Sequence, residues 1–346
     1  MLSLDLSQDW TPSTAQFNAS TIPIDVPNLA RGILWYHKTR SLLYTGLVGE
    51  PASYDWSDAP TFDGNLSLWT YGLQDRSWGE AIPSGSAVWN DLIRPDSALT
   101  AQTDDLGFAL NGLDKYASHG GTGMPGLLQF DMTSRSVSNI TSGDPYDTPK
   151  SWGSLQFVPT WGTQGFIVAF GGWGNGMSSL DSLPILDPAT QKWYQQNATG
   201  DLPAGRRDYC VAGAESTNGT FEIFFYGGNL IGGVSSTSRD TIHILTLPAF
   251  HWIQVQYTPD ESRAGHTCNY VNNTNQIIVI GGVRMDSEDI GSNEASRAIW
   301  SRPDSRKQGT AVFNLNTLKW EDGYSASAPA YEQSDPVKSF YARAGE

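Results

Sequence analysis

Short hydrophobic runs that end in two glycines recur along the chain. They read GFIVAFGG at 165–172, FEIFFYGG at 221–228 and QIIVIGG at 276–282. Each run is rich in β-branched and aromatic residues, which predicts a buried strand, and the glycine pair predicts a following turn with positive φ. The first glycines of the three pairs are 56 and 54 residues apart. The chain therefore contains a repeated β-unit of about this length.

A second pattern follows these runs and predicts the outer half of each unit. It consists of an alternating strand, about six further residues and then a tryptophan that covers the edge of the packed sheets. The clear copies end at Trp193, Trp252 and Trp320, and weaker ones end at Trp78, at Val137 in place of tryptophan, and at Trp10 after Leu2, Leu4 and Leu6. The chain thus has six predicted outer halves.

Inner strand pairs precede five of these outer halves. A period near 50 residues with a glycine pair and a later tryptophan is the kelch pattern, in which each repeat is one four-stranded blade of a β-propeller. We therefore expect one all-β domain, a six-bladed kelch-type propeller. The predicted blades are 31–78, 98–137, 151–193, 206–252 and 263–320, with 1–10 as the outer half of a closing blade and 321–346 as a tail.

Five inner halves against six outer halves leave one blade incomplete. Ring closure usually pairs the two chain ends within one blade, so that no sheet edge stays open. The tail holds no further glycine pair, and its residues 337–342 are expected to supply one strand at most. The pattern predicts an additional N-terminal piece that carries an inner strand pair and a signal peptide.

Composition agrees with a β-propeller and limits the partners. Glycine (36), proline (19), tryptophan (13) and tyrosine (14) are abundant, and charged residues make up only 16% of the chain. The net charge of -15 argues against nucleic acid or an anionic membrane as the main partner. The chain has no apolar run of spanning length and its first residues lack the features of a signal peptide. We expect a monomer without a cofactor.

The compartment is predicted from glycosylation sequons and cysteines. Six Asn-x-Ser/Thr sequons occur, at Asn18, Asn65, Asn139, Asn197, Asn218 and Asn272. They favour the secretory pathway and an extracellular or cell-surface location. Cys210 and Cys268 occupy similar places in consecutive repeats, so they are either bridged between neighbouring inner strands or buried as free thiols.

The motifs GRRDYC, FFYGG, HILTLPAFHW, GHTCNYV and IIVIGG resemble those of the extracellular kelch-repeat proteins of filamentous fungi. The resemblance covers nearly the whole chain and is strongest over 151–320. It implies a propeller of the galactose-oxidase type, with secretory signals, glycans and often a membrane anchor near the C-terminus. Most such proteins have no assigned activity, and a propeller alone implies none.

The candidate ligand-binding residues precede the inner strands, where loops converge on one mouth of the central channel. They are Arg31, Trp152, Arg206, Arg207, Arg263 and His266. Clustered arginines suit a carboxylate, an acidic or sulfated sugar, or an acidic peptide. The alternative interpretation makes each arginine a structural strut that bonds carbonyls or acids. The leading hypothesis is a binding module for a protein, peptide or glycan ligand.

The alternative function is a metal-assisted enzyme that uses the same mouth. The sequence does not favour a copper oxidase, because the five histidines at 37, 119, 243, 251 and 266 form no close pair of copper ligands. An iron-dependent lyase or specifier would draw on Asp260, Glu261 and His266, but the expected spacing of four is absent. No G-x-S-x-G elbow supports a hydrolase, and no helix follows GGWGNG at 171–176 to make a phosphate loop.

The insert at 285–307 is interpreted as a solvated excursion that covers one face of the ring.

Overall fold

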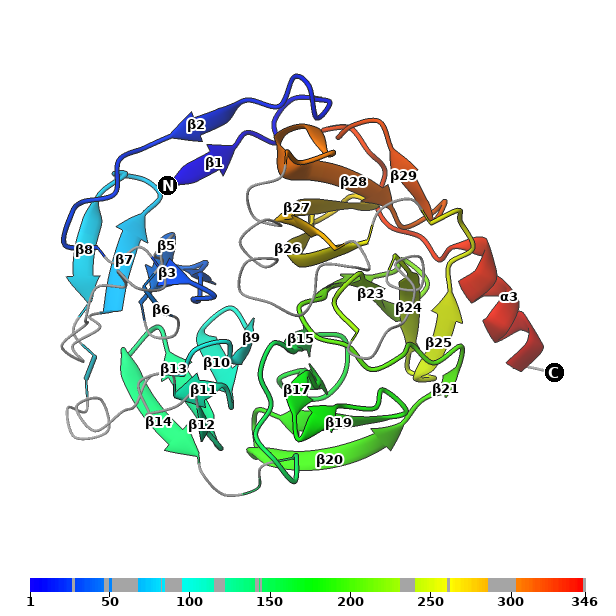
Figure 1. Cartoon of the computed structure of the whole chain (residues 1–346), viewed down its shortest axis with the longest axis horizontal. Helices are drawn as coiled ribbons and strands as arrows, with labels where there is room; N and C mark the ends of the chain where they lie inside the picture. The colour runs from blue at the N-terminus through cyan, green and yellow to red at the C-terminus, as the bar shows by residue number, and fades with distance from the viewer. Residues whose placement is uncertain are drawn as a thin grey trace.

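The computed structural model describes residues 1–26, 29–46, 50–51, 68–81, 83–84, 95–114, 122–140, 143, 145–230, 240–259, 262–285 and 303–344. These residues form a ring of antiparallel sheets around a central axis (Figure 1). In each blade four consecutive antiparallel strands follow one another in chain order from the centre to the rim, as expected of a β-propeller.

Five blades each contain four antiparallel strands. Blade 1 comprises β4 (Trp35–His37), β5 (Leu42–Thr45), β7 (Leu68–Gly72) and β8 (Trp78–Ala81); blade 2 comprises β9 (Leu99–Gln102), β10 (Leu106–Leu110), β13 (Leu127–Asp131) and β14 (Ser136–Ile140); blade 3 comprises β15 (Ser154–Val158), β16 (Phe166–Phe170), β19 (Ser182–Asp187) and β20 (Lys192–Asn197). Blade 4 comprises β22 (Cys210–Glu215), β23 (Phe221–Tyr226), β24 (Ile242–Leu247) and β25 (His251–Gln254), and blade 5 comprises β26 (Arg263–Tyr270), β27 (Gln276–Arg284), β28 (Thr310–Asn314) and β29 (Lys319–Glu321).

Several smaller elements accompany the five blades. A parallel strand, β21 (Thr199–Gly200), extends blade 4 beyond β25. Two-stranded sheets are formed by β1 (Leu2–Leu4) with β2 (Phe17–Ala19), β3 (Leu29–Ala30) with β6 (Glu50–Pro51), β11 (Leu113–Asp114) with β12 (Thr122–Gly123), and β17 (Trp173–Gly174) with β18 (Gly176–Met177). The last of these contains the GGWGNG motif, which makes a blade turn. A 3-10 turn, η2 (Lys307–Gly309), precedes β28.

The prediction of six blades is wrong, because the structure has five. The expected outer half at 1–10 pairs with neither an inner pair nor a strand of the tail. Instead, β1 pairs with β2 in a hairpin that lies in the arc between blade 5 and blade 1 (Figure 1). Trp10 does reach the end of the chain, since its backbone bridges Tyr324 and the two rings stack with centroids 5.5 Å apart. The alternation of Leu2, Leu4 and Leu6 specifies extended backbone, but a blade also requires inner strands to pair with.

The tail is helical where at most one strand is expected. The helix α3 (Asp335–Ala344) packs on blade 4 through Val337, which is fully buried. The Phe340 ring stacks on His251 with centroids 4.0 Å apart, and the Tyr341 hydroxyl lies 3.1 Å from the Thr246 hydroxyl. A tail that leaves blade 5 therefore covers the neighbouring blade.

Apolar faces of adjacent blades interlock around the aromatic residues that the repeats supply. Between blades 3 and 4, Trp252 is fully buried against Phe170 and Phe225, with ring centroids 6.1 and 5.6 Å away. Its indole N–H donates to the Leu180 carbonyl at 3.2 Å. Burying a ring of this size contributes roughly 2–3 kcal/mol to the free energy of unfolding. The blade interfaces therefore contribute strongly to the stability of the fold.

The glycine pairs serve two different needs. Both residues of the pairs at 227–228 and 281–282 have positive φ, as the sequence predicts. The pair at 171–172 does not, so the prediction is wrong there. A Cβ at Gly172 would instead collide with the Ser151 carbonyl oxygen. Close backbone approach, rather than a left-handed turn, therefore requires glycine at that position.

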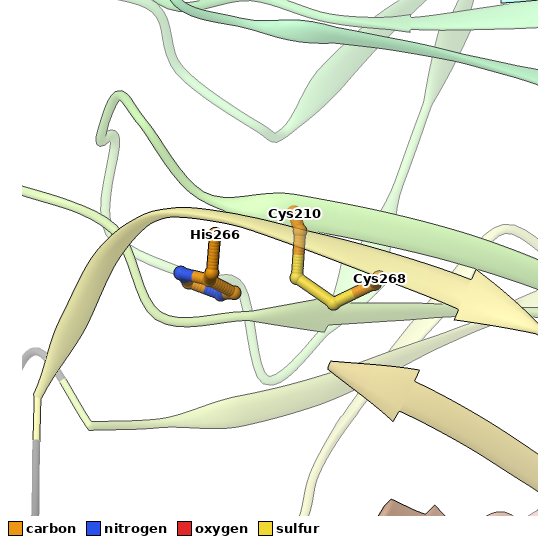
Figure 2. Close-up of side chains that lie close together, drawn as sticks. All are labelled: Cys210, His266 and Cys268. Atoms are coloured by element: carbon orange, nitrogen blue, oxygen red, sulfur yellow. A yellow bond between two sulfur atoms is a disulfide. The ribbon is translucent and has the colours of Figure 1, made fainter. Parts of the chain in front are cut away.

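A disulfide joins Cys210 on β22 to Cys268 on β26, the innermost strands of blades 4 and 5 (Figure 2). The two Cα atoms are 5.5 Å apart. Of the two states open from the sequence, the bridged one is therefore the state in the structure. It fastens two neighbouring blades near the axis, across a sequence separation of 58 residues.

Candidate functional site

One residue at the start of the innermost strand of each blade adopts a left-handed backbone conformation. These residues are Arg31, Ser97, Trp152, Asp208 and Gly265, with φ values of 54°, 54°, 57°, 57° and 70°. Four of the five carry side chains, so the left-handed geometry is imposed by the fold at some cost in strain. A left-handed residue therefore recurs near the start of all five innermost strands, and in blade 5 it lies within β26.

These turns are connected by backbone hydrogen bonds around the axis. The N–H of Trp152 donates to the Ser97 carbonyl at 3.0 Å, that of Asp208 to the Trp152 carbonyl at 2.9 Å, and that of Gly265 to the Asp208 carbonyl at 2.8 Å. Blades 2 to 5 are therefore linked turn to turn at one end of their inner strands. We call the side chains of Arg31, Asp96, Ser97, Trp152, Arg207 and Asp208 the mouth.

Two arginines from different blades meet at the Trp152 ring. The guanidinium carbon of Arg207 lies 4.8 Å from the ring centroid, and that of Arg31 lies 5.8 Å away. Both distances are within the range of cation–π attraction, which is worth about 0.5–2 kcal/mol depending on exposure. The indole N–H of Trp152 has no hydrogen-bond partner within the part of the chain that the structure describes. The mouth thus brings two cations to one indole ring, whose N–H is buried.

Carboxylates balance part of this positive charge. The Nε of Arg207 lies 3.5 Å from Asp208 Oδ2. Burial raises the pKa of Asp208, the charges of Arg207 and Arg31 oppose that rise, and Asp96 adds to it. Asp96 itself is buried and accepts a hydrogen bond from the Ser97 hydroxyl at 3.0 Å. The mouth is therefore a mixed-charge cluster rather than the uniformly cationic ring that the arginines suggest.

Arg206 lies inside the fold, although it adjoins Arg207 in sequence. Its Nε donates to the Ala204 carbonyl at 3.0 Å, and NH1 donates to the Gly227 carbonyl at 3.0 Å and to the Thr241 hydroxyl at 2.9 Å. The side chain is nearly fully buried, and burial lowers its pKa to about 10. The groups that it bonds lie in blade 4 and in the segment that leads into β22. This is the geometry of a structural strut.

Arg263 is fully buried and holds the end of the long insert. It donates two hydrogen bonds to Asp304, from NH1 at 3.1 Å and from NH2 at 2.5 Å, and NH1 also donates to the Gly281 carbonyl at 2.8 Å. Fork-shaped pairing of this kind fixes both partners. Most of the insert at 285–307 lies outside the described residues, but Asp304 and Arg306 return to the blade 4–5 boundary.

His266 is buried beside the disulfide instead of facing the mouth. Its ring packs edge-on to Tyr226 with centroids 5.0 Å apart. Burial, together with the positive charges of Arg306 and Arg263, lowers the pKa of His266 to about 3. The structure therefore brings Arg31, Trp152 and Arg207 together and separates Arg206, Arg263 and His266 from them.

Sequence reasoning missed the acidic part of the mouth. Asp208 directly follows Arg207 in GRRDYC, and Asp96 and Ser97 precede the inner strand of blade 2 in the same way. Their position just before an inner strand was the available signal, since it is the same position that selected the arginines. Asp260, Glu261 and His119, which the metal-enzyme alternatives name, lie outside the described residues.

The sequons that can be placed are all at the surface. Asn18, Asn139, Asn197, Asn218 and Asn272 are exposed, whereas Asn65 lies outside the described residues. Asn218 and Asn272 occupy the turns between β22 and β23 and between β26 and β27. Among the described residues, no helix combines the length and the apolar character that crossing a bilayer requires.

Comparison with known proteins agrees with the repeat pattern. A kelch repeat-containing protein of Arthroderma benhamiae is 26% identical over 94% of this chain. Acyl-CoA-binding domain-containing protein 5 of Arabidopsis thaliana is 27% identical over 50% of the chain, and human host cell factor 1 is 29% identical over 37%. A scan against protein families gives no match.

The similarity covers only part of each relative. The chain spans about half the length of the Arthroderma protein (52%), a quarter of the Arabidopsis protein (25%) and 6% of host cell factor 1. Within that span, the glycine-pair repeats, the ring of four-stranded sheets and the similarity to a kelch repeat-containing protein all describe the same architecture. The described residues therefore form a β-propeller whose repeats are similar to those of a kelch repeat-containing protein.

Proposed function

We propose that this propeller is a protein-interaction module whose mouth binds a carboxylate-bearing peptide segment of its partner. The observation that carries the proposal is the approach of two guanidinium groups, from Arg31 and Arg207, to the single indole of Trp152. A guanidinium group stacked on an aromatic ring has its N–H groups in its own plane, in the fork that matches a carboxylate.

The rest of the mouth favours a small acidic group over an extended polyanion. Asp208 and Asp96 lie close to the arginines and would repel a long run of negative charge. The net charge of -15 has the same effect at longer range. A single Asp, Glu or chain-terminal carboxylate placed between the two guanidinium groups avoids most of this repulsion.

We further propose that the protein works outside the cell or at its surface. The Cys210–Cys268 disulfide supports this location, because disulfides persist in oxidising compartments. The exposure of Asn18, Asn139, Asn197 and Asn272 supports it as well, since each is open to a glycan, whereas the Asn218 amide donates to Gln333 Oε1 at 3.0 Å. Release of mass by an N-glycosidase from protein expressed in a secreting host tests the location, and a chain that enters that pathway without gaining any glycan contradicts it.

The ligand proposal is tested with an immobilised library of acidic peptides and a matched library in which Asn and Gln replace Asp and Glu. We expect binding to the acidic set only, and a loss of about tenfold in affinity for Arg207→Ala and for Arg31→Ala, since one charge-assisted hydrogen bond is worth about 1.4 kcal/mol. Arg40→Ala is the matched control, because Arg40 is an exposed arginine in the β4–β5 turn of blade 1. Equal binding of both libraries, or equal loss in the control, would overturn the proposal.

A further inference from the structure

Three metal-ligating side chains meet between blades 4 and 5, away from the mouth. Figure 2 shows Cys210 on β22 and His266 and Cys268 on β26. Their potential ligand atoms all lie within 4.8 Å of one another. His266 and Cys268 are two residues apart on one strand, so they project from the same face of β26 towards blade 4.

His266 lacks the contacts that normally satisfy a buried imidazole. It is only 5% exposed, yet neither Nδ1 nor Nε2 makes a hydrogen bond of good geometry among the described residues, and its one polar interaction is with the Tyr226 backbone. Leaving a buried polar group unbonded costs about 1–3 kcal/mol.

The geometry points to a redox-gated site for a thiophilic metal ion of the zinc type, formed by Cys210, Cys268 and His266 once the disulfide is reduced. Zinc binds thiolate sulfur at about 2.3 Å and imidazole nitrogen at about 2.0 Å, which places the ligand atoms of a tetrahedral site about 3.5–3.8 Å apart. In the present cluster the two sulfur atoms are bonded, so they have to separate to reach this spacing. Zinc usually has a fourth ligand, which water can supply at a site of this kind.

Replacement of the disulfide by a metal ion takes two steps, reduction and then metal binding. A dithiol reductant gives two electrons and two protons to the Cys210–Cys268 bond, closes its own disulfide and leaves two thiols in the protein. The metal ion then binds two thiolates and the neutral ring, and the two thiol protons pass to solvent. The same pair of strands is thus joined by a covalent bond when oxidised and by a metal ion when reduced.

The site is independent of the mouth, and Co²⁺ provides its probe. The full chain is reduced with a dithiol, freed of reductant without air and titrated with Co²⁺. We expect one equivalent to produce the thiolate charge-transfer and tetrahedral d–d absorption bands, Zn²⁺ to abolish them, and the oxidised chain to show none. Cys268→Ser and His266→Gln should weaken binding by more than about 100-fold, because removing a ligand costs more than removing its supporting contacts. His243→Gln, a change at another buried histidine in blade 4, should leave it unchanged.

Absence of the bands in the reduced chain, or equal weakening by His243→Gln and His266→Gln, would overturn the site. If the reduced chain unfolds without metal, protection of its cysteines replaces the titration. Zn²⁺ should then restore the circular dichroism of the fold and shield both thiols from iodoacetamide, and alkylation at the same rate with and without Zn²⁺ would overturn the proposal.

Discussion

The guanidinium groups of Arg206 and Arg207 lie in different environments, although the two residues are adjacent in sequence. Arg206 donates to the Gly227 carbonyl inside blade 4, whereas Arg207 lies 4.8 Å from the centroid of Trp152 at the mouth. Replacing each by alanine should therefore separate stability from binding. Arg206→Ala should destabilise the fold by about 3 kcal/mol, since it leaves buried acceptors unbonded. Arg207→Ala should destabilise the fold by no more than about 1 kcal/mol, the size of the lost contact with Trp152.

Urea unfolding and acidic-peptide binding, measured on both variants, check this prediction. Arg207→Ala should weaken peptide binding at near wild-type stability, and Arg206→Ala should retain binding once conditions keep it folded. The reverse assignment, with Arg206→Ala binding weakly at full stability, would contradict the placement of the two side chains.

The disulfide should contribute strongly to stability. Joining residues 58 positions apart restricts the unfolded chain by about 4 kcal/mol in the loop-closure model. The double change of Cys210 and Cys268 to alanine should therefore shift the urea midpoint markedly downward without altering the strand content. The oxidised wild type and the double variant are compared in metal-free buffer, and identical midpoints would show that the cross-link adds nothing.

Acid should destabilise the propeller through its buried histidines. Burial and the charge of Arg206 lower the pKa of His243 to about 3, while an unfolded histidine has a pKa near 6.5. The unfolded chain takes up the proton first, so the stability present above pH 6.5 falls as the pH is lowered towards 3. The slope is about 1.4 kcal/mol per pH unit for each such histidine. His243→Gln should reduce the slope between pH 6 and 4 by about this amount, and an unchanged slope would exclude the burial effect.

Glu222 should have the opposite dependence on pH. It is fully buried on β23, accepts a hydrogen bond from the Thr246 hydroxyl at 2.7 Å, and burial raises its pKa. The folded state therefore favours the protonated acid, and stability is lost as the pH rises above the unfolded value near 4.5. Glu222→Gln keeps the shape without the charge. We expect it to be more stable than wild type by about 1 kcal/mol at pH 8 and equal to it near pH 4, as measured by thermal unfolding at both values.

Local patterns predicted the strands well because they depend on neighbouring residues. The runs before the glycine pairs form β16, β23 and β27, and the alternating segments before Trp193, Trp252 and Trp320 form outer strand pairs. The number of blades depends on closure of the ring, which no single segment encodes. The tail shows the same limit, since the contacts of Val337 with blade 4 join residues far apart in sequence.

The mouth was predicted by position but not by orientation. The place of Arg31, Trp152 and Arg207 before inner strands indicated that they converge, and their rings and guanidinium groups do meet. Which of Arg206 and Arg207 lies at the mouth depends on the left-handed backbone conformation of Asp208. Such a conformation cannot be predicted from sequence when the residue is not glycine.

The amide-to-carbonyl links between Ser97, Trp152, Asp208 and Gly265 are made by main-chain atoms alone. Their geometry does not depend on which amino acids occupy these places, provided that each tolerates the left-handed turn. Related propellers are thus free to exchange the chemistry displayed around the axis while keeping its supports, so the selectivity of one such protein says little about that of another.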